Sequence, residues 1–157
     1  MKLKNNLTFD SIIQTYEDQH GCSFDSEQLK ELKAGYESGL HIDAYADPII
    51  DYLTMFSIRR AIEDRREYLS NHRAQCRFAQ YVYDGFDEMQ LDELAIGLSR
   101  CVSVDLYAHR SLNHEEMHII RRGLEMGVNV LNLVHNGHEL HEIHQILGVD
   151  NFYEIGD

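Results

Sequence analysis

Histidines are the residues whose spacing in this sequence most suggests chemistry. Seven of the ten lie within residues 109–144. His114 and His118 stand four apart, a spacing that lets two imidazoles on one helix face chelate a transition metal. His138 and His141 belong to a run spaced by three, which drifts about 60° around a helix at each step. Because these histidines have no accompanying cysteine or fourth ligand, we expect a solvated polar face and no cofactor, with these four as the alternative metal ligands.

Arginines form a second cluster, because six of them lie within residues 59–77 beside only three carboxylates. Arg59 is accounted for by an ordinary ion pair with a glutamate one turn later. Arg65, Arg66 and Arg73 are not accounted for in this way. They either bind a partner or phosphate group, or neutralise the acidic segments beside them.

Carboxylates form the third cluster. The formal net charge of the 157 residues is −13, beyond the magnitude of about 2–8 that solubility requires of a small domain. Such a charge repels nucleic acid and anionic lipid and favours a basic protein partner. The densest acidic stretch, which we predict to contact a partner, contains Asp84, Asp87, Glu88, Asp92 and Glu93.

Motifs of enzymes are missing from the sequence. It contains no G-x-S-x-G, no glycine-rich phosphate loop and no cysteine paired with a histidine in a recognisable context. The three cysteines have no CxxC spacing, which is typical of reduced thiols. With no signal peptide and no apolar run of 18 residues, we expect a cytoplasmic protein of one domain without catalytic activity.

An internal repeat predicts the elements that position these side chains. FDSEQLKELKAGYESGLHIDAYA at 24–46 aligns with FDEMQLDELAIGLSRCVSVDLYA at 86–108, a shift of 62. A shift of 26 aligns segments inside each half. We therefore predict an all-α protein of short helical repeats, because similarity at such periods indicates a helical array. The predicted units are 24–49, 50–83 with an insertion of about ten residues, 86–111, 112–135 and a truncated 136–157.

Each unit carries the same helix-start signal. Asp25, Asp51, Asp87 and Asn113 are N-cap types, and three of the four are followed three residues later by Gln or Glu, which predicts a capping box. Small residues recur in mid-helix, where Gly costs about 1 kcal/mol relative to Ala, which indicates close approach of a neighbour. We further expect a short helix at 8–19.

The second unit departs from this pattern. Arg65 stands where other units have a terminal glycine, and residues 57–82 contain no Gly or Pro. We therefore predict one long central helix that continues to about residue 82 and is stopped by Asp84-Gly85.

The segments EEMHIIRRGLEMGVNV (115–130) and GLHIDAYADP (39–48) resemble a short repeat, roughly QMxxIRxGLExGLDVxxYAxP, found in proteins of Gram-positive phages and mobile elements. The resemblance covers about two thirds of the chain and departs from the repeat at Arg65-Arg66 and at the histidine-rich tail. It implies a setting on a phage or conjugative element and carries no catalytic residue.

Charge, repeat and resemblance lead to one functional hypothesis. We expect an acidic interaction module that inhibits a host defence protein with a basic nucleic-acid-binding surface, in the manner of an anti-CRISPR or anti-restriction factor and DNA mimic. The alternatives are a structural or adaptor repeat, as a homodimer for example, and a histidine-rich metal-binding regulator.

Overall fold

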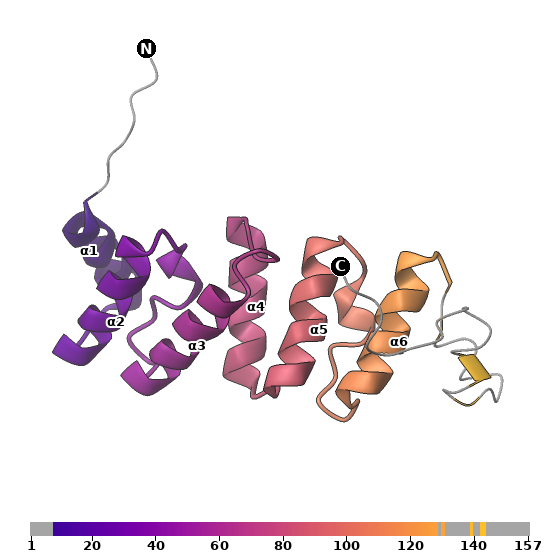
Figure 1. Cartoon of the computed structure of the whole chain (residues 1–157). Helices are drawn as coiled ribbons and strands as arrows, with labels where there is room; N and C mark the ends of the chain where they lie inside the picture. Colours follow the sequence, from indigo (N-terminus) through magenta and orange to yellow (C-terminus); the bar gives the residue numbers. More distant parts are fainter. Residues whose placement is uncertain (1–7, 129, 131–138, 140–141, 144–157) are drawn as a thin grey trace, which may run out of the picture. The chain divides into compact units, whose positions relative to one another are not determined.

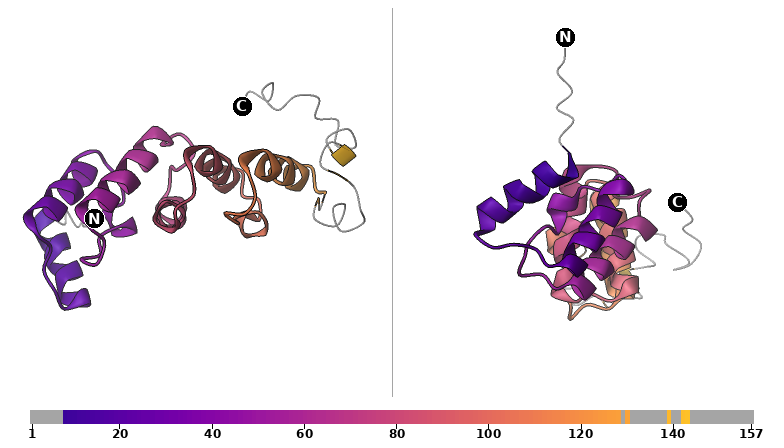
Figure 2. Two further views of the ribbon diagram at one scale, coloured as in Figure 1. Left: turned by 90° about the horizontal axis from the view of Figure 1, so that it is seen from below. Right: turned by 90° about the vertical axis from the view of Figure 1, so that its left-hand side faces the viewer.

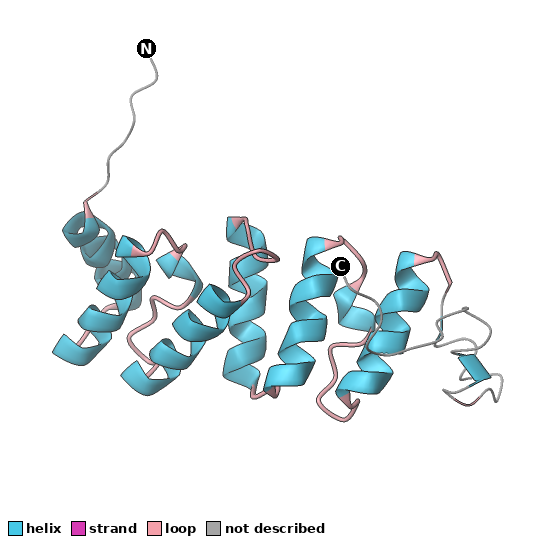
Figure 3. Ribbon diagram, in the orientation of Figure 1, coloured by secondary structure: helices cyan, strands magenta, loops and turns pink. Residues whose placement is uncertain are grey.

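The computed structural model describes residues 8–128, 130, 139 and 142–143, and these residues form helices, turns and loops without a strand (Figures 1 and 3). The predicted all-α class is therefore confirmed. The chain divides into two compact units, residues 1–84 and 85–157. No helix in the described part of the chain is both long enough and apolar enough to cross a membrane.

The described part of the first unit, residues 8–84, contains four α-helices and one 3₁₀ turn. They are α1 (Phe9–His20), α2 (Ser26–Glu37), η1 (Ile42–Ala44), α3 (Tyr52–Asp64) and α4 (His72–Asp84). Helix α2 packs on α3, and α3 packs on α4 (Figure 2). The turn η1 lies against both α2 and α4. The short helix expected at 8–19 is therefore confirmed as α1.

The described part of the second unit contains α5 (Glu88–Ser99), η2 (Val104–Leu106) and α6 (His114–Glu125). Helices α5 and α6 pack side by side, and η2 lies against α5 (Figure 1). These three elements follow the order of α2, η1 and α3 in the first unit. Of the predicted fifth segment, 136–157, only residues 139 and 142–143 are described, so that prediction lies largely outside the described residues.

The predicted helix caps are present. The side chains of Asp25, Asp51, Asp87 and Asn113 each accept a hydrogen bond from the backbone amide three residues later. A complete capping box forms at the start of α2, α5 and α6, where the third residue is Gln or Glu. These bonds satisfy amides that the first turn of a helix leaves without partners, so the helices start where the local sequence predicts.

The two capping glutamines also link each helix to a distant loop. The Nε2 atom of Gln28 donates to the carbonyl oxygens of Pro48 (2.9 Å) and Ile50 (2.7 Å). In the second unit, Nε2 of Gln90 donates to the carbonyls of Arg110 (3.2 Å) and Leu112 (2.7 Å). Both glutamines are buried, and each holds the loop that leads to the next helix.

Tyrosines from the 3₁₀ turns explain the small residues in mid-helix. Tyr45 lies against Gly35 in the first unit, and Tyr107 lies against Gly97 in the second. A β-carbon at either glycine would overlap the tyrosine hydroxyl. The repeated phrases LHIDAYA and VSVDLYA therefore supply a ring that packs where the preceding helix has no side chain.

The predicted long central helix is wrong, because α3 ends at Asp64 and α4 begins only at His72. The backbone of Arg65 leaves helical geometry with φ of −119°. Its side chain is buried, donates from Nη1 to the Ala61 carbonyl (3.1 Å) and lies over the ring of Phe78 on α4. Asn71 then caps α4 by accepting the amide of Ala74 (2.9 Å). Packing α4 against α3 buries Arg65, Leu69 and Phe78, which one straight helix could not do.

Candidate functional site

The predicted histidine pair does not form a metal site in the described structure. His118 is buried, and its Nδ1 lies 2.9 Å from Oε1 of Glu93 on the neighbouring helix. The same nitrogen lies 3.2 Å from Nη2 of Arg121. The described residues bring no third metal ligand together with His114 and His118. His138 and His141 lie outside the described residues.

Glu93 is the centre of a buried ionic network between α5 and α6. Arg121 donates from Nε to Oε2 of Glu93 (2.7 Å) and also pairs with Glu125. The side chains of Glu93 and Arg121 are 13% and 3% exposed. Burial would raise the pKa of Glu93, but the hydrogen bond from His118 and the charge of Arg121 outweigh it and hold this pKa below its usual value.

The acidic cluster predicted to contact a partner is therefore smaller than expected. Asp84, Asp87, Glu88 and Asp92 are exposed, whereas Glu93 is half-buried in the network and is withdrawn from the surface set. Asp84 belongs to the first unit and the other three to the second. Glu88 and Asp92 stand one turn apart on α5, so they project from the same helix face.

The predicted arginine surface also needs correction. Arg65 is 4% exposed and holds the end of α3, so it cannot serve as a partner contact. Arg66 and Arg73 are exposed. Arg66 donates from Nη2 to the Ser38 hydroxyl (2.7 Å), and Arg59 pairs with Glu31 (2.8 Å) and Glu63 (3.0 Å). Much of the basic stretch is thus engaged inside the first unit.

No family model, no curated protein and no solved structure matches this chain.

Charge is divided unevenly between the two units. Residues 1–84 contain ten basic and fourteen acidic side chains, a net charge of −4. Residues 85–157 contain four basic and thirteen acidic side chains, a net charge of −9. The second unit, although it has fewer residues, thus carries most of the net negative charge.

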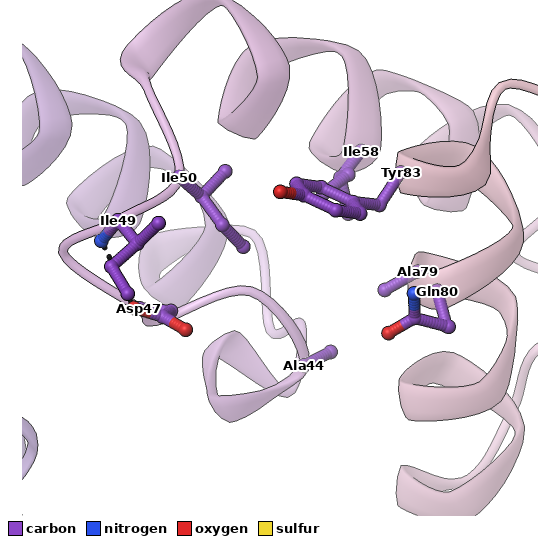
Figure 4. A pocket seen from close by; sticks show the side chains of 8 residues that line it. All are labelled: Ala44, Asp47, Ile49, Ile50, Ile58, Ala79, Gln80 and Tyr83. Atoms are coloured by element: carbon purple, nitrogen blue, oxygen red, sulfur yellow. Dashed lines mark hydrogen bonds between the residues drawn. The ribbon is translucent and has the colours of Figure 1, made fainter.

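A pocket of about 290 Å³ opens on the first unit between the loop after η1 and helices α3 and α4 (Figure 4). Its lining is mostly apolar, and the ring of Tyr83 points from α4 toward Ile50 and Ile58 (Figure 4). Ile49 and Tyr83 at its edge are 80% and 52% exposed. Its lining includes no histidine and no cysteine, and Asp47 is its single carboxylate.

Sequence reasoning missed one group of metal-ligand types. Asp43 of η1 and His72 and Cys76 of α4 place a carboxylate oxygen, an imidazole nitrogen and a thiol sulfur within 4.8 Å of one another. No enzyme motif in the sequence pairs a cysteine with a histidine, but the structure brings Sγ of Cys76 to 3.5 Å from Nε2 of His72. The available signal was the i,i+4 spacing of His72 and Cys76, which is informative only once α4 is known to begin at His72.

Proposed function

We propose that this chain is a non-enzymatic, acidic protein-interaction module whose partner has a basic nucleic-acid-binding surface. In the setting implied by the resemblance to repeats of Gram-positive phages and mobile elements, that partner is a host defence protein. The chain then acts as an inhibitor of the anti-CRISPR or anti-restriction type, with its carboxylates occupying the groove that otherwise holds phosphates.

The observation that carries this proposal is the way the second unit uses its basic residues. Three of its four arginines point at two inward carboxylates. Arg121 pairs with Glu93 and Glu125, and Arg100 (3.4 Å) and Arg122 (2.7 Å) also pair with Glu125. These inward pairs neutralise carboxylates that a partner could not reach anyway.

Seven further carboxylates of the described part of this unit are exposed, namely Asp87, Glu88, Asp92, Asp105, Glu115, Glu139 and Glu142. Their field extends over about 8–10 Å at ordinary ionic strength. Such a field attracts a basic protein surface and raises its association rate, and it repels nucleic acid.

Some of these charges also have an ordinary structural role. Acidic side chains in the first turn of a helix stabilise it by about 0.3–1 kcal/mol each, and Glu88 and Glu115 occupy such positions. Asp92 lies beyond the first turn of α5, so helix stabilisation does not account for the whole set.

The proposal is tested by a tagged pull-down from a Gram-positive host lysate at low and high salt. The matched variants are E88K/D92K on α5 and E37K/E67K, which changes the net charge equally at exposed positions of the first unit. We expect wild type and E37K/E67K to retain the same basic nucleic-acid-binding protein at low salt and to release it at high salt. If E88K/D92K retained the partner as well as wild type does, or if retention did not depend on salt, the α5 face that carries Glu88 and Asp92 would be excluded as the contact.

A second candidate function is self-association as a structural or adaptor protein. It is favoured by the apolar side chains exposed on α3 and the loop before it, among them Ile49, Leu53 and Phe56. Light scattering on the purified chain decides this candidate. A dimer that becomes a monomer in Leu53→Lys supports it, and a monomeric wild type rules it out.

A further inference from the structure

The strongest unassigned cluster lies in the first unit, where η1 meets the start of α4. The Nε2 atom of His72 contacts Oδ2 of Asp43 on one side. On the other side it lies 3.5 Å from Sγ of Cys76. His72 and Cys76 are one turn apart on α4, and the imidazole of His41 lies 5.2 Å from that of His72. One nitrogen is thus approached by both a carboxylate and a thiol.

The fold holds these donors in position through a buried glutamine. Gln75 lies between His72 and Cys76 in the sequence and is 4% exposed. Its Oε1 accepts the backbone amide of His41 (2.9 Å), and its Nε2 donates to the carbonyl of Leu69 (2.9 Å). Gln75 therefore ties the residues before η1 to the start of α4, which fixes Asp43 relative to His72 and Cys76. A preorganised donor set loses less entropy when an ion binds.

We propose that Asp43, His72 and Cys76 bind a divalent transition-metal ion, with Zn²⁺ as the ion that fits this donor set best. Thiolate, imidazole and carboxylate are the three ligand types that Zn²⁺ takes in proteins, and it prefers four in a tetrahedron. The fourth position belongs to His41 or to water.

An ordinary ion pair between His72 and Asp43 is the competing interpretation. It accounts for the carboxylate and the imidazole, because such pairs are common on surfaces and contribute little. It does not account for Cys76, whose sulfur converges on the same nitrogen. A cation among the three atoms favours the thiolate and releases the thiol proton to solvent.

The site is accessible and does not depend on the proposed function. The side chains of His72 and Asp43 are 56% and 30% exposed, which leaves a path for the ion. A bound ion would join η1 to α4 and thereby stabilise the folded first unit. This inference concerns the first unit, whereas the proposed partner contact is on the second.

The test is a titration of the reduced full-length chain with Co²⁺ followed by absorbance, then with Zn²⁺ by calorimetry. Co²⁺ replaces Zn²⁺ in tetrahedral sites and gives a thiolate charge-transfer band that histidines alone do not produce. Competing imidazoles are removed in a background in which His135, His138, His141 and His144 are changed to Asn. The sulfur is identified by comparing Cys76→Ala with Cys22→Ala and Cys101→Ala, which change exposed cysteines.

We expect one Co²⁺ per chain with a thiolate band in wild type, in the histidine-depleted background and in both control cysteine variants. Cys76→Ala abolishes the band, and His72→Gln and Asp43→Asn weaken Co²⁺ binding about tenfold or more. Zn²⁺ raises the thermal midpoint of wild type and leaves that of Cys76→Ala unchanged. The proposal would be overturned if wild type gave no Co²⁺–thiolate band or if the band survived Cys76→Ala. Loss of Co²⁺ binding in the background that lacks His135, His138, His141 and His144 would also overturn it. Circular dichroism of each variant shows that it is folded.

Discussion

The hydroxyl of Tyr107 lies over Gly97, where it donates a hydrogen bond to the carbonyl oxygen of Glu93 at 3.0 Å. A side chain at position 97 would occupy the space that this hydroxyl fills. Tyr45 and Gly35 stand in the same relation 62 residues earlier. In each unit, a 3₁₀ turn is thus attached to the middle of a helix by one aromatic ring.

Replacing either glycine by alanine is expected to destabilise the protein. Overpacking a well-filled core costs about 1–3 kcal/mol. The better helix propensity of alanine returns about 1 kcal/mol. Tyr45 and Tyr107 are buried, so their rings cannot move aside freely. Urea unfolding should show a lower midpoint for Gly35→Ala and Gly97→Ala but not for Lys33→Ala, an exposed control on α2. Unchanged or raised midpoints for the glycine variants would contradict the packing described.

Removing the two tyrosine hydroxyls is expected to have unequal effects. The Tyr107 hydroxyl donates to Glu93, whereas that of Tyr45 is buried and has no hydrogen-bond partner in the described part of the chain. Tyr107→Phe should lower the free energy of unfolding by about 1 kcal/mol, the net value of one such bond. Tyr45→Phe should be neutral or slightly stabilising, because a buried polar atom without a partner is removed. Equal losses in urea unfolding would contradict this difference.

Gln90 is expected to contribute more to the free energy of unfolding than its capping hydrogen bond alone would. Gln90→Glu keeps the size of the side chain and its bond to the Asp87 amide, but it loses the donor that binds the carbonyls of Arg110 and Leu112. Buried polar atoms without partners cost about 1–3 kcal/mol, so the free energy of unfolding should fall by that amount. Thr54→Ala at the equivalent position of α3 removes only an exposed side-chain bond and is the control. A loss in Gln90→Glu no larger than in Thr54→Ala would show that the cross-link contributes nothing.

The buried network around Glu93 predicts a pH dependence. The pKa of Glu93 is lower in the folded protein than its ordinary value of 4.5. In this pH range the folded state therefore binds fewer protons than the unfolded state. The stabilisation that ionised Glu93 contributes to folding is complete above about pH 4.5. It is lost as the pH falls through the lowered pKa. Glu93→Gln should flatten unfolding free energy against pH in this acidic window.

The same variant should also be less stable at pH 7. Removing one partner of a buried pair costs about 3–5 kcal/mol, and Arg121 keeps Glu125, so a value toward the lower end is expected. Glu31→Gln, in the more exposed pair with Arg59, should cost less. An unchanged acid profile in Glu93→Gln would show that other groups control acid unfolding.

The helix starts could be predicted because they depend on neighbouring residues only. Asp25, Asp51, Asp87 and Asn113 bond to amides three positions away, and this requirement is visible in any short stretch of sequence. The mid-helix glycines likewise indicated a close neighbour. That the neighbour is a tyrosine ring from the following turn required the structure.

Contacts between distant residues could not be predicted. The sequence alone predicts Glu93 on the surface, because nothing local reveals His118 and Arg121, 25 and 28 positions away. It also predicts Arg65 on the surface, since a buried arginine over Phe78 requires the chain to turn at that point. The metal-ligand cluster depends on the same turn, because it brings α4 back to η1 and so brings His72 to Asp43. Asn71, an N-cap type inside the predicted long helix, is the local signal of the new helix start.

Competition with DNA for the retained basic partner tests the central claim most directly. A fluorescent duplex bound to that partner at low salt is titrated with wild type, E88K/D92K and E37K/E67K. We predict displacement by wild type and E37K/E67K, about tenfold weaker displacement by E88K/D92K, and weakening of both effective competitors as salt is raised. The account would be contradicted if the duplex stayed bound to the partner when the wild-type chain is added, or if both variants displaced it equally.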